Sequence, residues 1–333
     1  MKSIFSFLII FTFFSTVIFG QDSTSAFPHH LPVNSISVSP NGEYFVSCAG
    51  KAGSAGELLL WRANSGRQHA IVYPNINFEI RTACFTPNGM YIMTAGGSYT
   101  ESSIQFWEIL TGNVLHDFQS VPQRIRNAAF SSDGQYLFSI HSVPNSRKSK
   151  ITKWNMLKEI VNEIEFDTLQ TNITAFRRDG LQIAMIGYEG SVVLLSAESG
   201  VKELSFMRNN SSKITTLDYN LTGTKLIIGT ATGRVEVWNI EDNLRLETTV
   251  AENTGKVTCA KISPNQKMIL VSTVTENNSQ FQVYDLNSRE LLKIFKIEGE
   301  ITTFDITPDS RYVMLGTKEG NIQFFDLEKK SEQ

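Results

Sequence analysis

The chain of 333 residues has little excess charge of either sign. It contains 30 lysine and arginine residues against 33 aspartate and glutamate residues, a formal net charge of −3 at pH 7. Proteins that bind nucleic acid without sequence preference carry a basic tail or stripe, because the phosphate backbone attracts cations. The sequence has no such tail or stripe, so we do not expect nucleic acid as a partner.

Cysteine is scarce. Cys48, Cys84 and Cys259 each lie in an apolar context typical of a strand. An odd number cannot pair completely within one chain. Cys48 and Cys84 fall in neighbouring repeats and are the one pair we consider for a disulfide. Buried, reduced cysteine is the expectation that we favour.

Catalytic and metal-binding motifs are also missing. The five histidines are scattered, and the adjacent pair His29-His30 is a poor metal site by itself. No Gly-x-Ser-x-Gly elbow is present. The glycine-rich segment 50–56 lacks the spaced Gly-Lys-Ser/Thr of a phosphate loop and is typical of a turn. We therefore expect no catalytic residues, no metal and no cofactor.

What the sequence does have is a repeat. Seven short apolar runs each end in a four-residue turn, and the turns begin 43 to 47 residues apart. A fixed period of this length predicts a stack or ring of one supersecondary unit. The turns are Ser39–Gly42, Thr86–Gly89, Ser131–Gly134, Arg177–Gly180, Asn220–Gly223, Ser263–Gln266 and Thr307–Ser310.

Each repeat has the pattern of four antiparallel strands. In the fifth repeat, an apolar β-branched run over 225–230 and an alternating run over 234–238 follow the turn, and a fourth strand is predicted over 244–250. Seven such units predict an all-β fold, a seven-bladed β-propeller of four-stranded antiparallel blades. We expect the residue that ends each third strand to pack between blades: Trp61, Trp107, Trp154, Leu195, Trp238, Tyr284 and Phe325.

The repeats resemble the WD-repeat β-propeller family over roughly residues 29–327. The resemblance rests on the Ser-Pro-Asn-Gly turn and its variants, followed by pairs such as Trp238-Asn239 and Tyr284-Asp285. No repeat ends in Trp-Asp, and only His29 stands at the distance of the family's Gly-His pair. We therefore expect most of the family's His–Ser–Asp–Trp hydrogen bonds to be missing. The resemblance also implies that an N-terminal strand, near 24–31, completes the last blade.

The N-terminus predicts export. Residues 3–20 carry no charge and follow Lys2, a pattern typical of a signal peptide cleaved after Gly20. The alternative is an uncleaved signal anchor, because the run approaches membrane-spanning length. We accordingly predict a secreted, luminal or periplasmic protein, or one that is membrane-anchored. The predicted divisions are 1–20 (signal peptide or anchor), 21–33 (N-terminal segment), 34–327 (propeller) and 328–333 (polar tail).

The turns also serve as a ruler for the channel mouth, where the first strand of each blade begins. Counting back five residues from each turn selects a polar ring that includes two arginines in adjacent blades, Arg81 and Arg126. Arginine suits planar carboxylates, and binding residues concentrate on loops held by a rigid frame. We predict that blades two and three bind an acidic protein or peptide segment; the alternative is a solvated charged surface. The candidate residues are Arg81, Tyr99, Arg126, Arg147, Lys148 and Lys150, of which the last three stand in the loop predicted over 141–150 of blade three.

These observations favour a non-catalytic protein-binding scaffold, either a monomer or a subunit of a complex. Two alternatives stay open. One is a hydrolase or lactonase-like propeller, which needs a metal or clustered carboxylates in the channel. The other is a membrane-anchored propeller similar to exchange factors of the early secretory pathway, which needs an uncleaved N-terminal segment and a propeller facing the cytosol.

Overall fold

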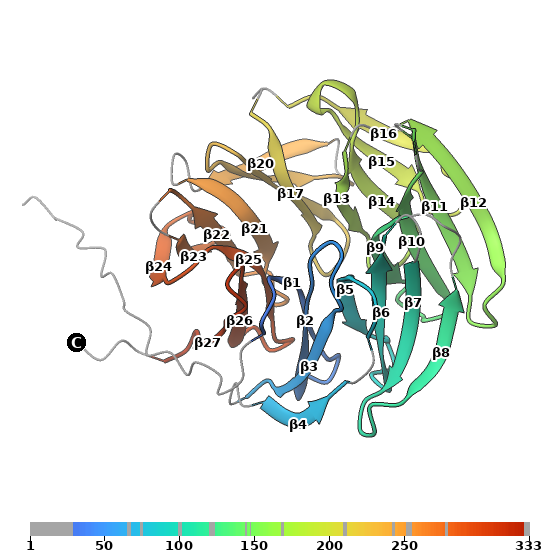
Figure 1. Cartoon of the computed structure of the whole chain (residues 1–333). Helices are drawn as coiled ribbons and strands as arrows, with labels where there is room; N and C mark the ends of the chain where they lie inside the picture. The colour runs from blue at the N-terminus through green and yellow to red at the C-terminus, as the bar shows by residue number, and fades with distance from the viewer. Residues whose placement is uncertain are drawn as a thin grey trace, which may run out of the picture.

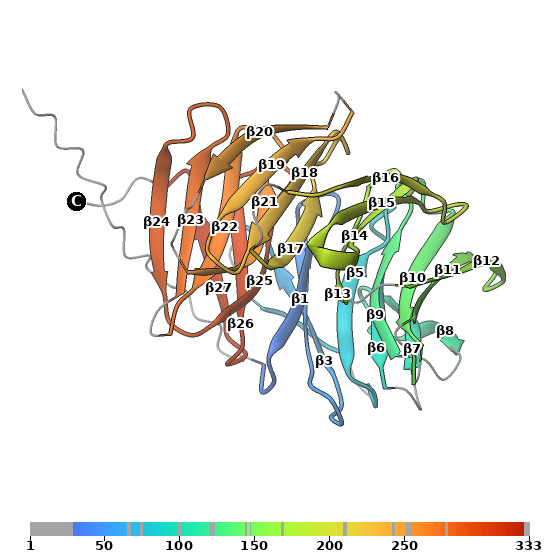
Figure 2. The ribbon, with the colours of Figure 1, turned by 90° about the horizontal axis from the view of Figure 1, so that it is seen from above.

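A computed structural model describes residues 29–329, except for gaps at 65–67, 74–75, 99–101, 120–123, 144, 147, 168–169, 209–211, 242–243, 251–254 and 277–278. The described residues form 27 strands in seven antiparallel sheets arranged as a ring (Figure 1). The innermost strands are β1, β5, β9, β13, β17, β21 and β25, and the view from above in Figure 2 shows the sheets side by side. The predicted seven-bladed propeller is confirmed.

The first four blades each contain four strands. Blade one has β1 (Val33–Val38), β2 (Tyr44–Ala49), β3 (Glu57–Arg62) and β4 (Gln68–Val72). Blade two has β5 (Ile80–Phe85), β6 (Tyr91–Gly97), β7 (Ser102–Glu108) and β8 (Val114–Gln119). Blade three has β9 (Arg124–Phe130), β10 (Tyr136–Ser142), β11 (Lys148–Asn155) and β12 (Ile160–Asp167). Blade four has β13 (Gln170–Phe176), β14 (Gln182–Ile186), the 3-10 turn η1 (Tyr188–Gly190), β15 (Val192–Ser196) and β16 (Lys202–Phe206).

The remaining three blades complete the ring. Blade five has β17 (Ile214–Tyr219), β18 (Lys225–Thr230), β19 (Val235–Asn239) and β20 (Arg245–Val250). Blade six has β21 (Lys256–Ile262), β22 (Met268–Val274), β23 (Ser279–Asp285) and β24 (Leu291–Ile297). Blade seven has β25 (Ile301–Ile306), β26 (Tyr312–Thr317) and β27 (Ile322–Asp326).

Blade seven meets blade one directly, because β1 contacts both β25 and β26. Among the described residues blade seven has three strands. Most of the segment predicted to supply the fourth, 24–31, lies outside the described residues. Its described part does reach blade seven, since the His29 backbone N–H donates to the Gly320 carbonyl over 2.9 Å. The predicted ring-completing strand and the predicted domain divisions stay predictions.

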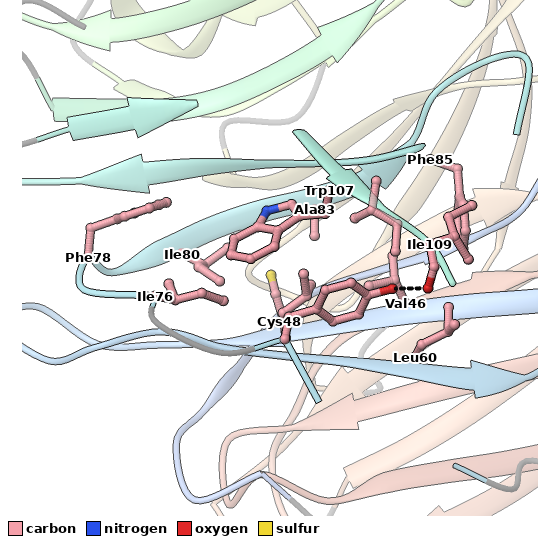
Figure 3. Packing of buried hydrophobic residues seen from close by; sticks show 13 residues of the cluster. Val46, Cys48, Leu60, Ile76, Phe78, Ile80, Ala83, Phe85, Trp107 and Ile109 are labelled. Carbon is pink, nitrogen blue, oxygen red and sulfur yellow. Dashed lines mark hydrogen bonds between the residues drawn. The ribbon is translucent and has the colours of Figure 1, made fainter. Parts of the chain in front are cut away.

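The core lies between the blades. Figure 3 shows the cluster between blades one and two, where Trp107 lies beside Cys48 and the cluster extends from Phe78 at one end to Val46 toward the other. The predicted third-strand anchors are all buried, with Trp61 and Trp107 at 0% exposure, which confirms their packing role. Cys48, Cys84 and Cys259 are all free, and burial raises the pKa of the Cys84 thiol to about 12. The expectation of unpaired thiols holds for all three cysteines, whereas full burial holds for Cys48 alone, because Cys84 and Cys259 are half-buried.

Hydrogen bonds stiffen the blades more than the sequence suggested. In blade one the Trp61 indole donates to the Ser47 hydroxyl over 2.7 Å, and His29 Nε2 lies 2.7 Å from the same oxygen. Blade three repeats this arrangement with a histidine from its own second strand: Trp154 donates to Ser139, and His141 Nε2 is 2.7 Å from that hydroxyl. The expected loss of the polar set is thus only partial.

The repeated turns contact one another around the whole ring. A Cβ added to Gly42 would lie 3.2 Å from Pro308 of the preceding blade, and Gly89 and Gly134 face Pro40 and Pro87 in the same way. Two further junctions bring a side chain against a glycine in the same way: Ser131 against Gly180 and Arg177 against Gly223. The last two junctions are hydrogen bonds, between Asn220 and Gln266 and between Asn265 and Ser310. The seven turns therefore form a closed collar that fixes the spacing of the blades.

Candidate binding face at the channel mouth

The residues found by counting back five positions from each turn lie at β-bulges. The pairing of first and second strands skips one residue at that point in six blades: Asn34, Arg81, Arg126, Thr215, Thr258 and Thr302. In blade four the irregularity spans 171–173. A bulge leaves one residue out of the ladder and redirects its side chain, often beside a binding site. The selected position is therefore a bulge in six blades and falls within an irregular segment in the fourth.

Blades two and three alone place arginine at the bulge. The Arg81 side chain is 28% exposed, and its Nη2 lies 2.6 Å from Glu79 Oε1. Arg124, which opens β9, places its Nη2 3.2 Å from Glu79 Oε2. Arg126 donates from Nε to the Ser142 hydroxyl over 2.6 Å. We call Arg81, Arg124 and Arg126, with Glu79 between them, the arginine cluster.

Glu79 is the buried member of the cluster, with a side chain only 6% exposed. Burial raises its pKa, while the charges of Arg124 and Arg126 oppose that rise. Its backbone is fixed as well, since the Gly97 N–H donates to the Glu79 carbonyl over 2.7 Å. The Glu79 carboxylate is therefore fixed between two arginines that come from different blades, Arg81 and Arg124.

The cluster has unused hydrogen-bonding capacity. Three guanidinium groups surround one carboxylate, and Nε of Arg81 and Nε of Arg124 are buried with no acceptor among the described residues. A cavity of about 430 Å³ opens beside Glu79 and Arg124 and is also bordered by residues 52–55. The glycine-rich turn of blade one thus forms part of its wall. This arrangement is suited to an anionic group that brings several acceptor oxygens.

The other predicted site residues are not gathered with Arg81 and Arg126. Lys148 and Lys150 lie in β11 rather than in a loop, because β10 and β11 extend to within six residues of each other. Each pairs across the sheet with an acidic residue of β12: Lys148 with Glu165 at 3.8 Å and Lys150 with Glu163 at 2.6 Å. Tyr99 and Arg147 lie outside the described residues.

Sequence reasoning missed Glu79 and Arg124. Both stand two residues before a bulge position, in the patterns Glu79-x-Arg81 and Arg124-x-Arg126. Residues two apart share one side of a regular strand, so the pattern was available as a signal. The bulge makes this pattern hard to interpret, because the register of the ladder shifts at Arg81 and at Arg126.

A second charged group lies in the channel near the turns. Lys261 Nζ is 2.9 Å from Asp305 Oδ1, and Asp305 Oδ2 accepts the Val38 backbone N–H over 2.9 Å. Burial raises the pKa of the nearby Asp218, against the opposing charge of Lys261. These side chains border a channel cavity of about 600 Å³ or the smaller one next to it. In the described part of the chain, no three His, Cys, Asp or Glu side chains are placed to hold a metal.

Comparison with known proteins agrees with this architecture. A family model described as "WD domain, G-beta repeat" matches residues 21–61, the first repeat. Together with seven blades built on one repeated turn, that match decides the family. The chain is a WD-repeat β-propeller. The single matched repeat is the one that keeps the His29–Ser47–Trp61 hydrogen bonds, whereas the other repeats are more divergent.

Several curated proteins are distantly similar to this WD-repeat chain. Eukaryotic translation initiation factor 3 subunit I of Debaryomyces hansenii is 22% identical over 68% of this chain and 56% of its own length. Human protein NEDD1 is 19% identical over 83% of this chain and 41% of its own length. Mouse cilia- and flagella-associated protein 57 is 23% identical over 72% of this chain and 20% of its own length. The chain thus spans about half the length of the first of these and less of the others.

The predicted localisation outside the cytosol is wrong. The relatives are named for translation initiation and for cilia and flagella, which are processes and structures inside the cell. The prediction rested only on the apolar character of residues 3–20, which lie outside the described residues. Apolar composition records hydrophobicity and not the destination of a protein. No helix in the described part of the chain is long and apolar enough to cross a membrane.

Proposed function

We propose that this WD-repeat propeller is a non-catalytic scaffold that binds an acidic segment of a partner protein at the arginine cluster. The observation that carries the proposal is that Arg81 and Arg124 share a single carboxylate, Glu79, while Arg126 adds a third guanidinium beside it. A carboxylate-rich segment would supply the acceptors that the two Nε–H groups lack.

The position of the cluster on the ring supports this proposal. Bulged first strands on a rigid ring hold the side chains in place, so binding loses little conformational entropy. One similar protein is named as a subunit of a translation initiation factor, which accords with a role inside an assembly.

The test uses a short fluorescent oligoglutamate peptide and measures its affinity by anisotropy. Arg126→Glu and the double variant Arg81→Glu/Arg126→Glu are expected to weaken binding at least about tenfold, because each reversal turns attraction into repulsion. The matched control is Lys256→Glu. Lys256 is exposed and stands two residues before the bulge of blade six, so it tests charge on the same face away from the cluster.

The outcomes separate clearly. Binding that falls with added salt, is lost in the arginine variants and survives in the control supports the proposal. An absence of binding by the wild-type protein, or equal loss in Lys256→Glu, overturns it. Thermal unfolding of each variant checks the fold. Arg126→Ala serves as the milder change if the double variant is destabilised by repulsion between Glu79 and the carboxylate introduced at position 81.

A further inference from the structure

Glu79 is an unusual residue for a site that attracts anions. The position two residues before the bulge is basic in several blades, for example Arg124, Lys213 and Lys256. Blade two instead carries a carboxylate there, and the structure places it against the arginines of its own blade and of the next. It is 6% exposed, whereas the equivalent acidic residue of blade seven, Glu300, is 35% exposed and pairs with the exposed Lys318.

The contacts of Glu79 are those that a ligand carboxylate would make. The two oxygens of Glu79 lie against two different guanidinium groups, each through a terminal nitrogen, Nη2. The Nε edge of each arginine, which completes the usual two-point contact with a carboxylate, is left unused. Glu79 therefore contacts both arginines but leaves their Nε–H groups without an acceptor, as a weakly bound ligand would.

We propose that Glu79 is a built-in counter-ion that the bound segment displaces, and that the cluster therefore favours a phosphate monoester over a single carboxylate. The inference rests on the proposed function. A ligand carboxylate that replaces Glu79 exchanges one carboxylate for another and gains little. A phosphate monoester carries a charge of about −1.5 to −2 and three acceptor oxygens, so it can contact terminal and Nε nitrogens together.

A purely structural role for Glu79 makes the opposite prediction. If Glu79 only positioned the arginines, its removal would loosen them and weaken the binding of every anion. If it competes for them, Glu79→Gln keeps the shape of the side chain, removes the competing charge and tightens binding. The sign of the effect therefore distinguishes the two roles, whatever its size.

The experiment compares three synthetic peptides of one otherwise uncharged sequence that carry serine, aspartate or phosphoserine at the centre. The wild-type protein is expected to bind the phosphoserine peptide at least about tenfold more tightly than the aspartate peptide, and the serine peptide least. Glu79→Gln is expected to tighten the binding of both anionic peptides about tenfold. The matched control, Glu300→Gln, removes a carboxylate at the same repeat position and is expected to change neither affinity.

Each result bears on the inference in one direction. Weaker or unchanged anion binding in Glu79→Gln, in a variant whose thermal unfolding matches the wild type, overturns the counter-ion role. Equal affinity of the wild type for the aspartate and phosphoserine peptides overturns the preference for phosphate. Failure of the proposed function is separate, because it appears as insensitivity of oligoglutamate binding to Arg126→Glu.

Discussion

At the scale of single residues, His141 shows how one buried side chain links stability to pH. It is 0% exposed, and its Nε2 faces the Ser139 hydroxyl that accepts from Trp154. Burial, assisted by the charge of Lys150, lowers the pKa of His141 from 6.5 to about 3. The imidazole is therefore neutral in the folded protein throughout the range in which it would be protonated in the unfolded chain.

This lowered pKa predicts that the folded state loses stability as the pH falls below 6.5. The unfolded chain takes up a proton that the folded protein does not, so the loss continues down to a pH of about 3. Between pH 7 and pH 5 the contribution of this one residue is about 2 kcal/mol. Urea unfolding at both pH values should show a smaller drop in His141→Gln than in the wild type. The control is His30→Gln, which alters an exposed imidazole; an equal drop in His141→Gln and the wild type would contradict the prediction.

The candidate binding residues differ in how well the sequence predicts their place in the fold. Arg81 and Arg126 could be predicted because they stand at a fixed distance from the turns, and the fold marks that distance with a bulge. Lys148 and Lys150 were assigned to a loop because their segment is polar, yet β11 begins at Lys148 and both residues pair with β12 in the ladder. Glu79 was not recognised as a partner of Arg124, because the repeat places the two residues at equivalent positions of adjacent blades but does not report a contact between them.

At the scale of elements, the repeated turn both reveals the fold in the sequence and makes contacts between neighbouring blades. Its spacing alone predicted the seven blades, because one unit repeated at a fixed period buries its faces only against copies of itself. The contacts between successive turns could not be predicted. They depend on which residues meet at each junction: Pro308 faces Gly42, whereas Asn220 donates a hydrogen bond to Gln266.

The contact between turns predicts unequal costs for two glycine substitutions. Gly42 (φ +72°) and Gly53 (φ +80°) both adopt the left-handed conformation, so alanine is strained at either site by about 1 kcal/mol. A Cβ at Gly42 also meets Pro308 at 3.2 Å, whereas a Cβ at Gly53 meets nothing within 4 Å. Gly42→Ala should therefore lower the free energy of unfolding by about 1 kcal/mol more than Gly53→Ala. Equal costs in urea unfolding would show that the collar does not stabilise the junctions between blades.

At the scale of the whole molecule, closure of the ring brings blade seven against blade one. Three kinds of contact join blade seven to blade one: the inner strands β25 and β1, the turns at Pro308 and Gly42, and the Asp305 carboxylate that accepts the Val38 N–H. Asp305 also holds Lys261 of blade six, so one side chain ties three consecutive blades together. A closed ring of blades leaves only short, protected strand edges, and loss of a closing contact should be felt by blades on both sides.

Asp305→Ala should therefore destabilise the ring by about 2 kcal/mol, because it leaves the part-buried Lys261 without its direct partner and the Val38 N–H without an acceptor. Asp218 remains near Lys261 and limits the loss. The double variant Lys261→Met/Asp305→Ala should recover part of the stability, since the unpaired ammonium is removed. Urea unfolding measures both changes, and faster hydrogen exchange at the Val38 amide locates the opening at the junction of blades seven and one. The control is Lys318→Ala, which breaks an exposed ion pair in blade seven and should have little effect. If Asp305→Ala costs no more than this control, closure depends on the apolar strands and the collar alone.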